Sequence, residues 1–287
     1  MLPIYKKEMR TYFTQMMGYV FLAFLLLLVG IFFTIVNVRG LNGNFQGVLQ
    51  NVTIFFFILI PVLTMRLFSE EVRQKTDQLL FTSPLSVAGI VLGKFLAAFS
   101  LFVIGVGVTI VLPLVLSRHG ELPVSQIAGS YVGFVLLGMA CIAIGLFVSV
   151  LTENQIIAAV GTMGAIFTMF LIDSIAVSMP ATTFASFVFV ALVILAVAGI
   201  FYHATRKIVA AVAVAIVGVL IAGGLYLTNN LLYDGLIVRT LLWFSLFTRY
   251  GYFARGVLRL SDIVYYISFS ALFIYLTVNV IEKRRWR

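Results

Sequence analysis

The chain contains little of what secreted domains and metalloproteins need. Its only cysteine is Cys141, and its only histidines are His119 and His203. A single cysteine excludes a disulfide framework and a cysteine-based metal site. Charged residues make up only 10% of the 287 residues. That share is too small for a soluble domain of this length, which needs a charged surface.

The motifs of common enzymes are also missing. The stretch Gly89–Lys94 is similar to a phosphate-binding loop, but the spacing between its glycines is one residue too short. It also lacks the serine or threonine after the lysine that would hold magnesium. No His-Glu-x-x-His motif and no nucleophile elbow occur. We therefore expect no catalytic, cofactor-binding or metal-binding residues in this chain.

The sequence is rich in long apolar segments. Hydrophobic residues make up 62% of the chain, which is typical of an integral membrane protein. Eight apolar segments are near the roughly 20 residues that cross a bilayer. They are residues 17–38, 53–68, 89–116, 127–151, 155–178, 184–202, 207–227 and 263–282. The pattern predicts an all-α, polytopic transmembrane helical bundle that forms a single domain, residues 1–287.

Two features leave the number of spans open. Pro61 is expected to kink the short second span. The sixth and seventh spans are separated only by residues 203–207, which form a tight turn or the tip of a re-entrant hairpin. Six spans plus such a hairpin is therefore the alternative to eight. Both counts place the two termini on the same side of the membrane.

The basic residues predict which side that is. With the N-terminus inside, thirteen lysines and arginines lie on the inner side and six on the outer side, which favours cytoplasmic termini. The net charge of +9 is concentrated at span ends, so it indicates membrane lipid as a partner and not nucleic acid. Residues 1–16 combine apolar and basic residues and predict an interfacial helix.

Polar residues within or between the spans are the remaining candidates for function. Residues 66–96 place a run of mixed charge between two apolar segments, and such a run must lie outside the lipid. It suits either a charged partner surface or an ordinary solvated loop. Asp173 is a carboxylate inside an expected span, near its outer end, and is a candidate intramembrane polar site. The outer segment 228–262 is apolar and aromatic and predicts short interfacial helices.

The central stretch resembles the membrane subunits of ATP-binding-cassette exporters of the second, bacterial-type class. The residues that match the pattern of that family are Arg66, Phe68, Ser69, Glu70, Glu71, Thr76, Leu79, Leu80, Thr82, Pro84, Leu85, Ser86, Gly93 and Lys94. The N-terminal IYKKEMRTYF and the stretch from Ala254 to Trp286 resemble the gliding-motility-type branch. The departure is the extra pair of spans in residues 184–227, because the common family plan has six.

The resemblance implies a mechanism and a set of partners. Residues 69–83 would form a coupling segment that docks on a separate cytoplasmic P-loop ATPase, which would hold the ATP and magnesium. The implied coupling residues are Glu70, Glu71, Arg73, Thr76, Leu79, Leu80 and Pro84. A homodimer or a pair with a sister chain would form the pathway in a bacterial inner membrane. Gliding-type systems also imply an extracytoplasmic accessory subunit.

The outer segment would resemble the short gating helices of the same family. The candidate gate residues are Trp243, Phe247, Tyr250, Arg255 and Arg259. Residues 1–16 would be the elbow helix at the membrane surface. The predicted function is thus the permease subunit of an ATP-driven exporter. The alternatives are a membrane scaffold or signalling subunit that moves nothing, and a membrane enzyme or passive channel, for which the sequence offers no active-site motif and no clearly polar span.

Overall fold

The computed structural model describes residues 1–40, 43, 45–75, 86–118, 122–180, 182–205, 207–228 and 230–285. These residues form helices and their connections, with no β-strand among them. The chain divides into two compact units, Met1–Phe170 with Leu246–Arg287, and Leu171–Ser245. We describe each unit by itself and call them unit 1 and unit 2.

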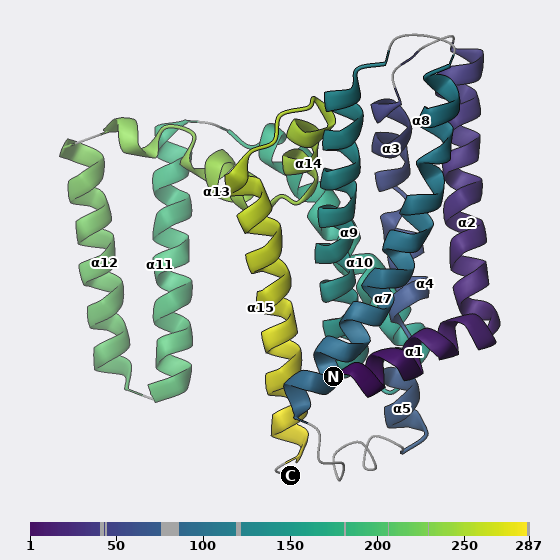
Figure 1. Ribbon diagram of the computed structural model, residues 1–287. Coiled ribbons are helices and arrows are strands. Elements are labelled where there is room, and N and C mark those ends of the chain that lie inside the picture. Colours follow the sequence, from purple (N-terminus) through teal and green to yellow (C-terminus); the bar gives the residue numbers. More distant parts are fainter. Residues whose placement is uncertain are drawn as a thin grey trace. The chain divides into compact units, whose positions relative to one another are not determined.

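Unit 1 contains most of the helices (Figure 1). They are α1 (Leu2–Thr14), α2 (Met16–Phe33), the π-helix η1 (Thr34–Arg39), α3 (Gln46–Thr53), α4 (Phe56–Thr64), α5 (Ser69–Arg73), α7 (Val87–Thr109), α8 (Val111–Leu116), α9 (Val124–Leu151), α14 (Phe247–Ala254) and α15 (Leu260–Arg285). Helix α10 (Gln155–Ser178) begins in unit 1 and ends in unit 2. Unit 2 also holds α11 (Thr183–Thr205), α12 (Ile208–Thr228), the 3-10 helix η2 (Asn230–Tyr233) and α13 (Leu236–Phe244).

The expected polytopic bundle is confirmed. Within the described residues, seven helices are long and apolar enough to cross a membrane, or up to nine if two bent helix pairs are each counted as a span. The seven are Met16–Arg39, Val87–Leu116, Val124–Leu151, Gln155–Ser178, Thr183–His203, Ile208–Thr228 and Leu260–Arg284. The chain is therefore a multi-pass membrane protein.

The expected second span, residues 53–68, contains α4, which forms a bent pair with α3 immediately before that range. The two helices meet at an angle of 65°, with the break between Thr53 and Phe56. The prediction of a kink at Pro61 is wrong in position, because Pro61 lies inside α4, five residues after the break. Figure 1 shows α3, α4 and α5 following one another from the far end of α2 to the end where α1 lies. The pair therefore traverses unit 1 as one broken span.

Helix α9 lies at the centre of unit 1. A larger share of its most apolar stretch is buried than in any other candidate span of the described chain. It contacts α3, α4, α7, α14 and α15. Three phenylalanine rings meet at its middle, with centroids 4.8 Å apart for Phe56 and Phe134 and 5.7 Å apart for Phe102 and Phe134. Contacts at these separations are favourable beyond simple area burial, so they help to hold α4 and α7 on α9.

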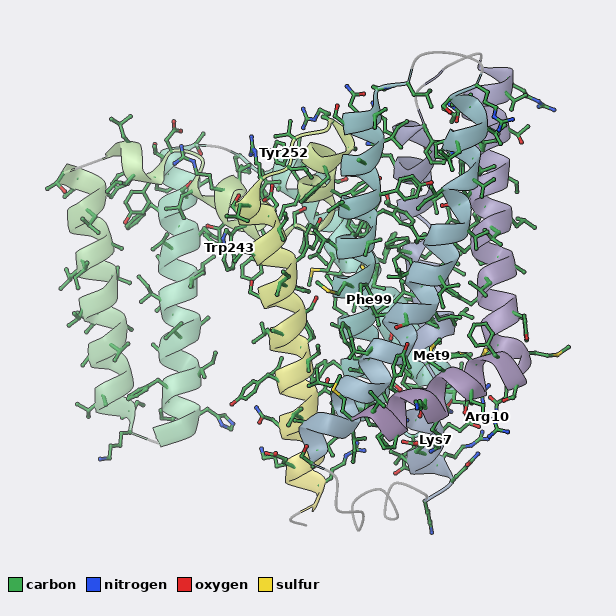
Figure 2. All side chains as sticks on the ribbon, in the orientation of Figure 1. Lys7, Met9, Arg10, Phe99, Trp243 and Tyr252 are labelled. Carbon is green, nitrogen blue, oxygen red and sulfur yellow. The ribbon has the colours of Figure 1, made fainter. Side chains whose placement is uncertain are left out.

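Helix α1 crosses one end of unit 1, the end at which α5 and the C-terminal part of α15 also lie (Figure 1). We call this the basal end, and the opposite end, where α8 and α14 lie, the distal end. A helix is present within the predicted range 1–16 and ends at Thr14; its place at the membrane interface stays a prediction. Its Ile4 is buried, whereas Lys7 and Arg10 are exposed at the basal end (Figure 2).

Candidate functional site

The corner between α4 and α5 is fixed to α9 by one hydroxyl group. Ser149 Oγ accepts hydrogen bonds from the backbone N–H groups of Phe68 at 3.0 Å and Ser69 at 3.2 Å. It also donates to the backbone oxygen of Met65 at 3.3 Å. Ser149 and Ser69 are both fully buried. Because buried N–H groups need acceptors, this contact fixes where α5 begins.

A buried ammonium group lies next to this corner. Lys94 Nζ, on α7, lies 2.7 Å from Glu8 Oε1 on α1 and 2.9 Å from Glu71 Oε1 on α5. Only 2% of the Lys94 side chain is exposed, and 12% of each carboxylate side chain. Lys7 Nζ, largely exposed, approaches Glu71 at 3.4 Å. We call Glu8, Glu71, Lys94 and Lys7 the basal ion cluster.

The basal ion cluster is electrically balanced, with two carboxylates and two ammonium groups. A lysine this deeply buried is strongly unfavourable unless it is paired and hydrogen-bonded. Lys94 has both carboxylates, and its Nζ also lies 5.1 Å from the centre of the Phe68 ring. The arrangement therefore joins α1, α5 and α7 through one side chain.

Helix α1 reaches Lys94 because α7 presents a glycine beside it. A Cβ atom at Gly93 would lie 3.0 Å from Ile4 Cβ and 3.1 Å from the backbone oxygen of Met1, closer than ordinary van der Waals contact. The Tyr5 hydroxyl also donates to Ser100 Oγ at 3.1 Å. The Gly93–Lys94 pair thus provides a close approach and a charge contact for the same helix.

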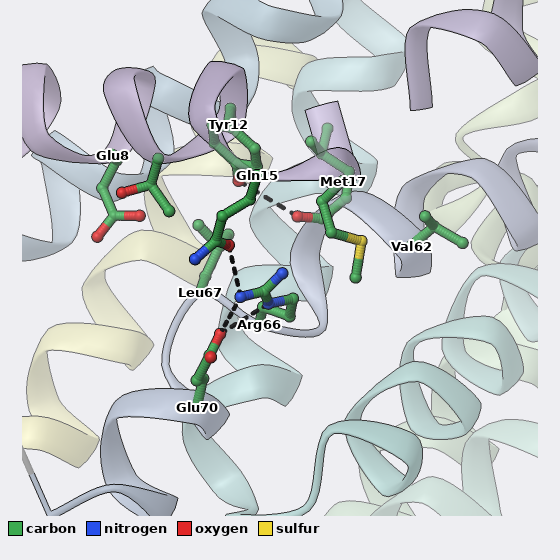
Figure 3. A pocket seen from close by; sticks show the side chains of 10 residues that line it. Glu8, Tyr12, Gln15, Met17, Val62, Arg66, Leu67 and Glu70 are labelled. Carbon is green, nitrogen blue, oxygen red and sulfur yellow. Dashed lines mark hydrogen bonds and ion pairs between the residues drawn. The ribbon is translucent and has the colours of Figure 1, made fainter. Parts of the chain in front are cut away.

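A small cleft lies between α1 and the α4–α5 corner (Figure 3). Its volume is about 50 Å³. Arg66 crosses it, 2.6 Å from Glu70 Oε2 and 2.6 Å from Gln15 Oε1, while the Tyr12 hydroxyl donates to the Leu63 backbone oxygen at 3.3 Å. Burial, with a smaller contribution from Glu8, raises the pKa of the Tyr12 phenol well above its usual value, so this group remains a neutral donor. The cleft is closed by contacts within the chain and offers little room for a ligand.

The structure describes some of the predicted coupling residues and not others. Glu70, Glu71 and Arg73 lie on α5. Glu71 faces inward to Lys94, Glu70 pairs with Arg66, and Arg73 is exposed. The remaining predicted residues lie outside the described residues; they are Thr76, Leu79, Leu80 and Pro84. Their role stays a prediction.

The predicted gate residues lie in both units. Tyr250, on α14, is buried, and Phe247 packs edge-on against Phe170 with ring centroids 5.3 Å apart. The Arg255 and Arg259 guanidinium groups lie 5.2 Å and 4.0 Å from the centre of one ring, that of Tyr252 (Figure 2). Trp243 is exposed on α13, in unit 2. Their role as a gate stays a prediction.

Helix α14 is held firmly at the distal end of unit 1. Arg249 Nη1 lies 2.6 Å from Asp262 Oδ1 on α15, and its guanidinium lies 3.8 Å from the centre of the Tyr265 ring. The Tyr266 hydroxyl donates to the Leu246 backbone oxygen at 2.5 Å. On the α9 side, a Cβ at Gly133 would lie 2.5 Å from Phe253 Cβ, so α14 packs directly on the backbone of α9.

Asp173 lies five residues before the end of α10 and is partly buried. Its Oδ1 atom is buried and has no hydrogen-bond partner among the described residues. In the same described part of the chain, no group of three or more histidine, cysteine, aspartate or glutamate side chains has the arrangement of a metal site. The contacts described at the basal end are charge pairs and hydrogen bonds between helices.

Residues 34–202 match the family described as ABC-2 family transporter protein, over more than half of the chain. The chain belongs to the ABC-2 transporter family. No curated protein and no solved structure matches it. The match extends from η1 to α11, so it includes the α4–α5 corner, Lys94 and Asp173 of this ABC-2 protein. Helix α1 and the predicted gate lie outside the matched residues.

Membership confirms the expected class of protein: this ABC-2 family chain is a membrane permease component and not itself an ATPase. Three contributors to the basal end were absent from the predicted site, namely Glu8, Lys94 and Ser149. Lys94 was recognised within the family pattern, and a charge within an expected span is a signal of function. Nothing in the local sequence of Glu8 or Ser149 indicates that they contact α7 or α5.

Proposed function

We propose that this ABC-2 protein is the permease subunit of an exporter in a bacterial inner membrane, driven by a separate cytoplasmic P-loop ATPase that holds the ATP and magnesium. The basal end would face the cytoplasm, in agreement with the distribution of basic residues. Residues 69–83 would dock on the ATPase. The partner permease would be a second copy or a sister chain, and the terminal segments favour a gliding-motility-type system with an extracytoplasmic accessory subunit.

The observation that best supports this proposal is the anchoring of α5. The expected coupling segment begins at Ser69, where the backbone is held by Ser149 of α9, and continues to Glu71, which is paired with Lys94 of α7. A merely solvated loop needs no such buried attachment to two membrane helices. A segment that receives force from a partner does need it, because a loosely held segment would move without moving the bundle.

The test is a mild-detergent purification from native membranes, with a tag at the C-terminus. We expect a P-loop ATPase in stoichiometric amount, identified by mass spectrometry. The double change Arg73→Glu and Lys75→Glu alters two exposed cations at the start of the coupling segment and should reduce its recovery. The matched control is Lys283→Glu with Arg284→Glu, the same charge change on exposed residues of α15.

Two results would contradict the proposal. Absence of any nucleotide-binding protein, under conditions that keep other transporter complexes intact, would rule out the ATP-driven permease and favour a channel or a scaffold. Recovery of an ATPase whose hydrolysis moves no solute or lipid across reconstituted membranes would favour the scaffold or signalling subunit. Recovery of an additional outward-facing subunit would support the gliding-type system.

A further inference from the structure

We infer that Lys94 is a positioning residue that transmits displacement of the coupling segment to α7 and α1. This inference rests on the proposed function, because it concerns how the docked segment acts on the membrane helices. It assigns a role to the basal ion cluster that docking itself does not require. Glu71 would act toward the interior of the permease and not toward the ATPase.

The geometry at α5 provides the first step. The backbone N–H of Ser69 is held by Ser149 Oγ at 3.2 Å, so the first residue of α5 is attached to α9. Two residues later, Glu71 Oε1 lies 2.9 Å from Lys94 Nζ. A force applied beyond Arg73 would therefore rotate α5 about its attached start. Glu71 is the first carboxylate along α5 that passes this rotation to another helix.

The burial of Lys94 provides the second step. If α5 moved away and α7 stayed, the Lys94 ammonium would keep only the Glu8 carboxylate in a site with almost no access to water. Separating a buried charge pair is far more costly than separating a surface pair. The lowest-energy response to displacement of α5 is that α7 follows it.

The third step joins α1 to the same movement. Glu8 Oε1 lies 2.7 Å from Lys94 Nζ, and Ile4 packs against Gly93 in the same turn of α7. Charge pairing and close packing therefore act together between α1 and α7. Since α1 lies across the basal end, its movement would reach the first span, α2, which begins two residues after α1 ends.

If the basal ion cluster served stability alone, apolar side chains could take its place. Well-packed apolar side chains of similar volume are often as stabilising as a buried ion pair, or more so. The pair Arg66–Glu70 offers the comparison within the same corner: its side chains are about a quarter exposed, and Arg66 also bonds to Gln15 at the end of α1, but no described contact of the pair reaches α7. Loss of that pair should not disconnect α5 from α7.

The experiment uses the complete complex with its ATPase and a spin label on α1. Arg10→Cys places the label on an exposed residue, and the only native cysteine, Cys141, is buried and does not compete for it. The label's mobility and its accessibility to water-soluble relaxing agents are compared without nucleotide and with ATP plus vanadate. We expect a nucleotide-dependent change in the otherwise unaltered complex.

The variants are Glu71→Gln and Lys94→Met, with Glu282→Gln, the same change at an exposed carboxylate of α15, as the matched control. We expect the first two to retain the ATPase in stoichiometric amount but to lose the nucleotide-dependent change at residue 10. Glu282→Gln should keep it. Loss of stability alone would lower yield or retention in every nucleotide state and would not remove the difference between states.

Three results would overturn the inference while leaving the proposed function intact. These are no nucleotide-dependent change in the labelled but otherwise unaltered complex, an undiminished change in Glu71→Gln and Lys94→Met, and an equal loss in Glu282→Gln. If instead the unaltered protein recovers no ATPase at all, the proposed function itself fails. The two failures are therefore distinguished by the purification step.

Discussion

The Ser149 hydroxyl of α9 accepts a hydrogen bond of 3.2 Å from the backbone N–H of Ser69, a residue 80 positions earlier in the chain. The same oxygen accepts from Phe68 N–H at 3.0 Å. One hydroxyl thus satisfies two buried backbone donors at the point where the chain leaves the broken span and enters the expected coupling segment. A serine fits this role because it is small enough to allow the close approach of α9.

Ser149→Ala should weaken the attachment of α5 to α9. It leaves two buried N–H groups without an acceptor, and each such group costs about 1–3 kcal/mol. We expect a clear decrease in the thermal unfolding midpoint of the purified protein in detergent. The matched control is Ser130→Ala, also buried on α9, whose described hydrogen bond is to the Gln126 backbone oxygen of its own helix. An equal decrease in both variants would show that Ser149 has no special role.

Much of this architecture can be predicted from the sequence, because a membrane span is recognised from the hydropathy of consecutive residues in one helix. The apolar runs predict seven of the spans within a few residues. Residues 53–68 do not form one span, because they contain only the nine-residue α4, which is bent by 65° from α3 at a position without a proline or glycine. The expected short helices in the outer segment are present as η2, α13 and α14. Each of these predictions depends on neighbours in sequence.

The basal ion cluster could not be predicted in the same way. Glu71 and Lys94 both belong to the family pattern, yet that pattern does not indicate that they touch, and Glu8 is 86 positions from Lys94. Whether a carboxylate on α1 meets Lys94 depends on how α1 packs at Gly93. A shift of one residue along α1 would turn Glu8 away. Three-dimensional packing, and not local pattern, determines the pairing.

Lys94→Met should destabilise the protein more than any change of an exposed cation. The substitution leaves Glu8 and Glu71 largely buried beside an apolar side chain, and breaking a buried ion pair by removing one partner costs about 3–5 kcal/mol. Lys7→Met is the control, because its partner is the same Glu71 but its side chain is 59% exposed. For Lys7→Met we expect the free energy of unfolding to decrease by less than about 1 kcal/mol.

Chemical denaturation of the two lysine variants in detergent measures this difference. The free energies of unfolding are to be compared at one pH and one salt concentration, because the exposed pair is weakened by salt and the buried pair much less. A smaller loss for Lys94→Met than for Lys7→Met would contradict the burial and pairing described for the basal end.

Gly133→Ala should push α14 away from α9. The added Cβ would lie 2.5 Å from Phe253 Cβ, so either the helices separate or the side chain shifts. Overpacking of this kind costs about 1–3 kcal/mol. Gly164→Ala on α10 is the control, because a Cβ there meets no atom within 4 Å, and alanine favours the helix. The midpoint temperature of thermal unfolding should fall for Gly133→Ala and stay level or rise for Gly164→Ala.

Arg249→Met and Asp262→Asn should each release α14 from α15. Asp262 is buried and its Oδ1 lies 2.6 Å from Arg249 Nη1, so either single change leaves a poorly compensated polar group. The loss for Arg249→Met should be the larger, up to about 3–5 kcal/mol, because it leaves a charged carboxylate in an apolar environment. Arg255→Met is the control: it removes an exposed guanidinium whose described ring contact is with Tyr252 at 5.2 Å.

The double variant Arg249→Met with Asp262→Asn separates pairing from simple packing. If the two groups stabilise each other, the decrease in the free energy of unfolding is smaller for the double variant than the sum of the decreases for the two single variants. The reason is that the double variant leaves neither partner charged without its counterpart. The coupling free energy is obtained from unfolding of all four proteins in detergent. Strict additivity would mean that the 2.6 Å contact contributes nothing to holding α14. Phe253 against Gly133 and Tyr266 against Leu246 would then be the contacts that fix this helix.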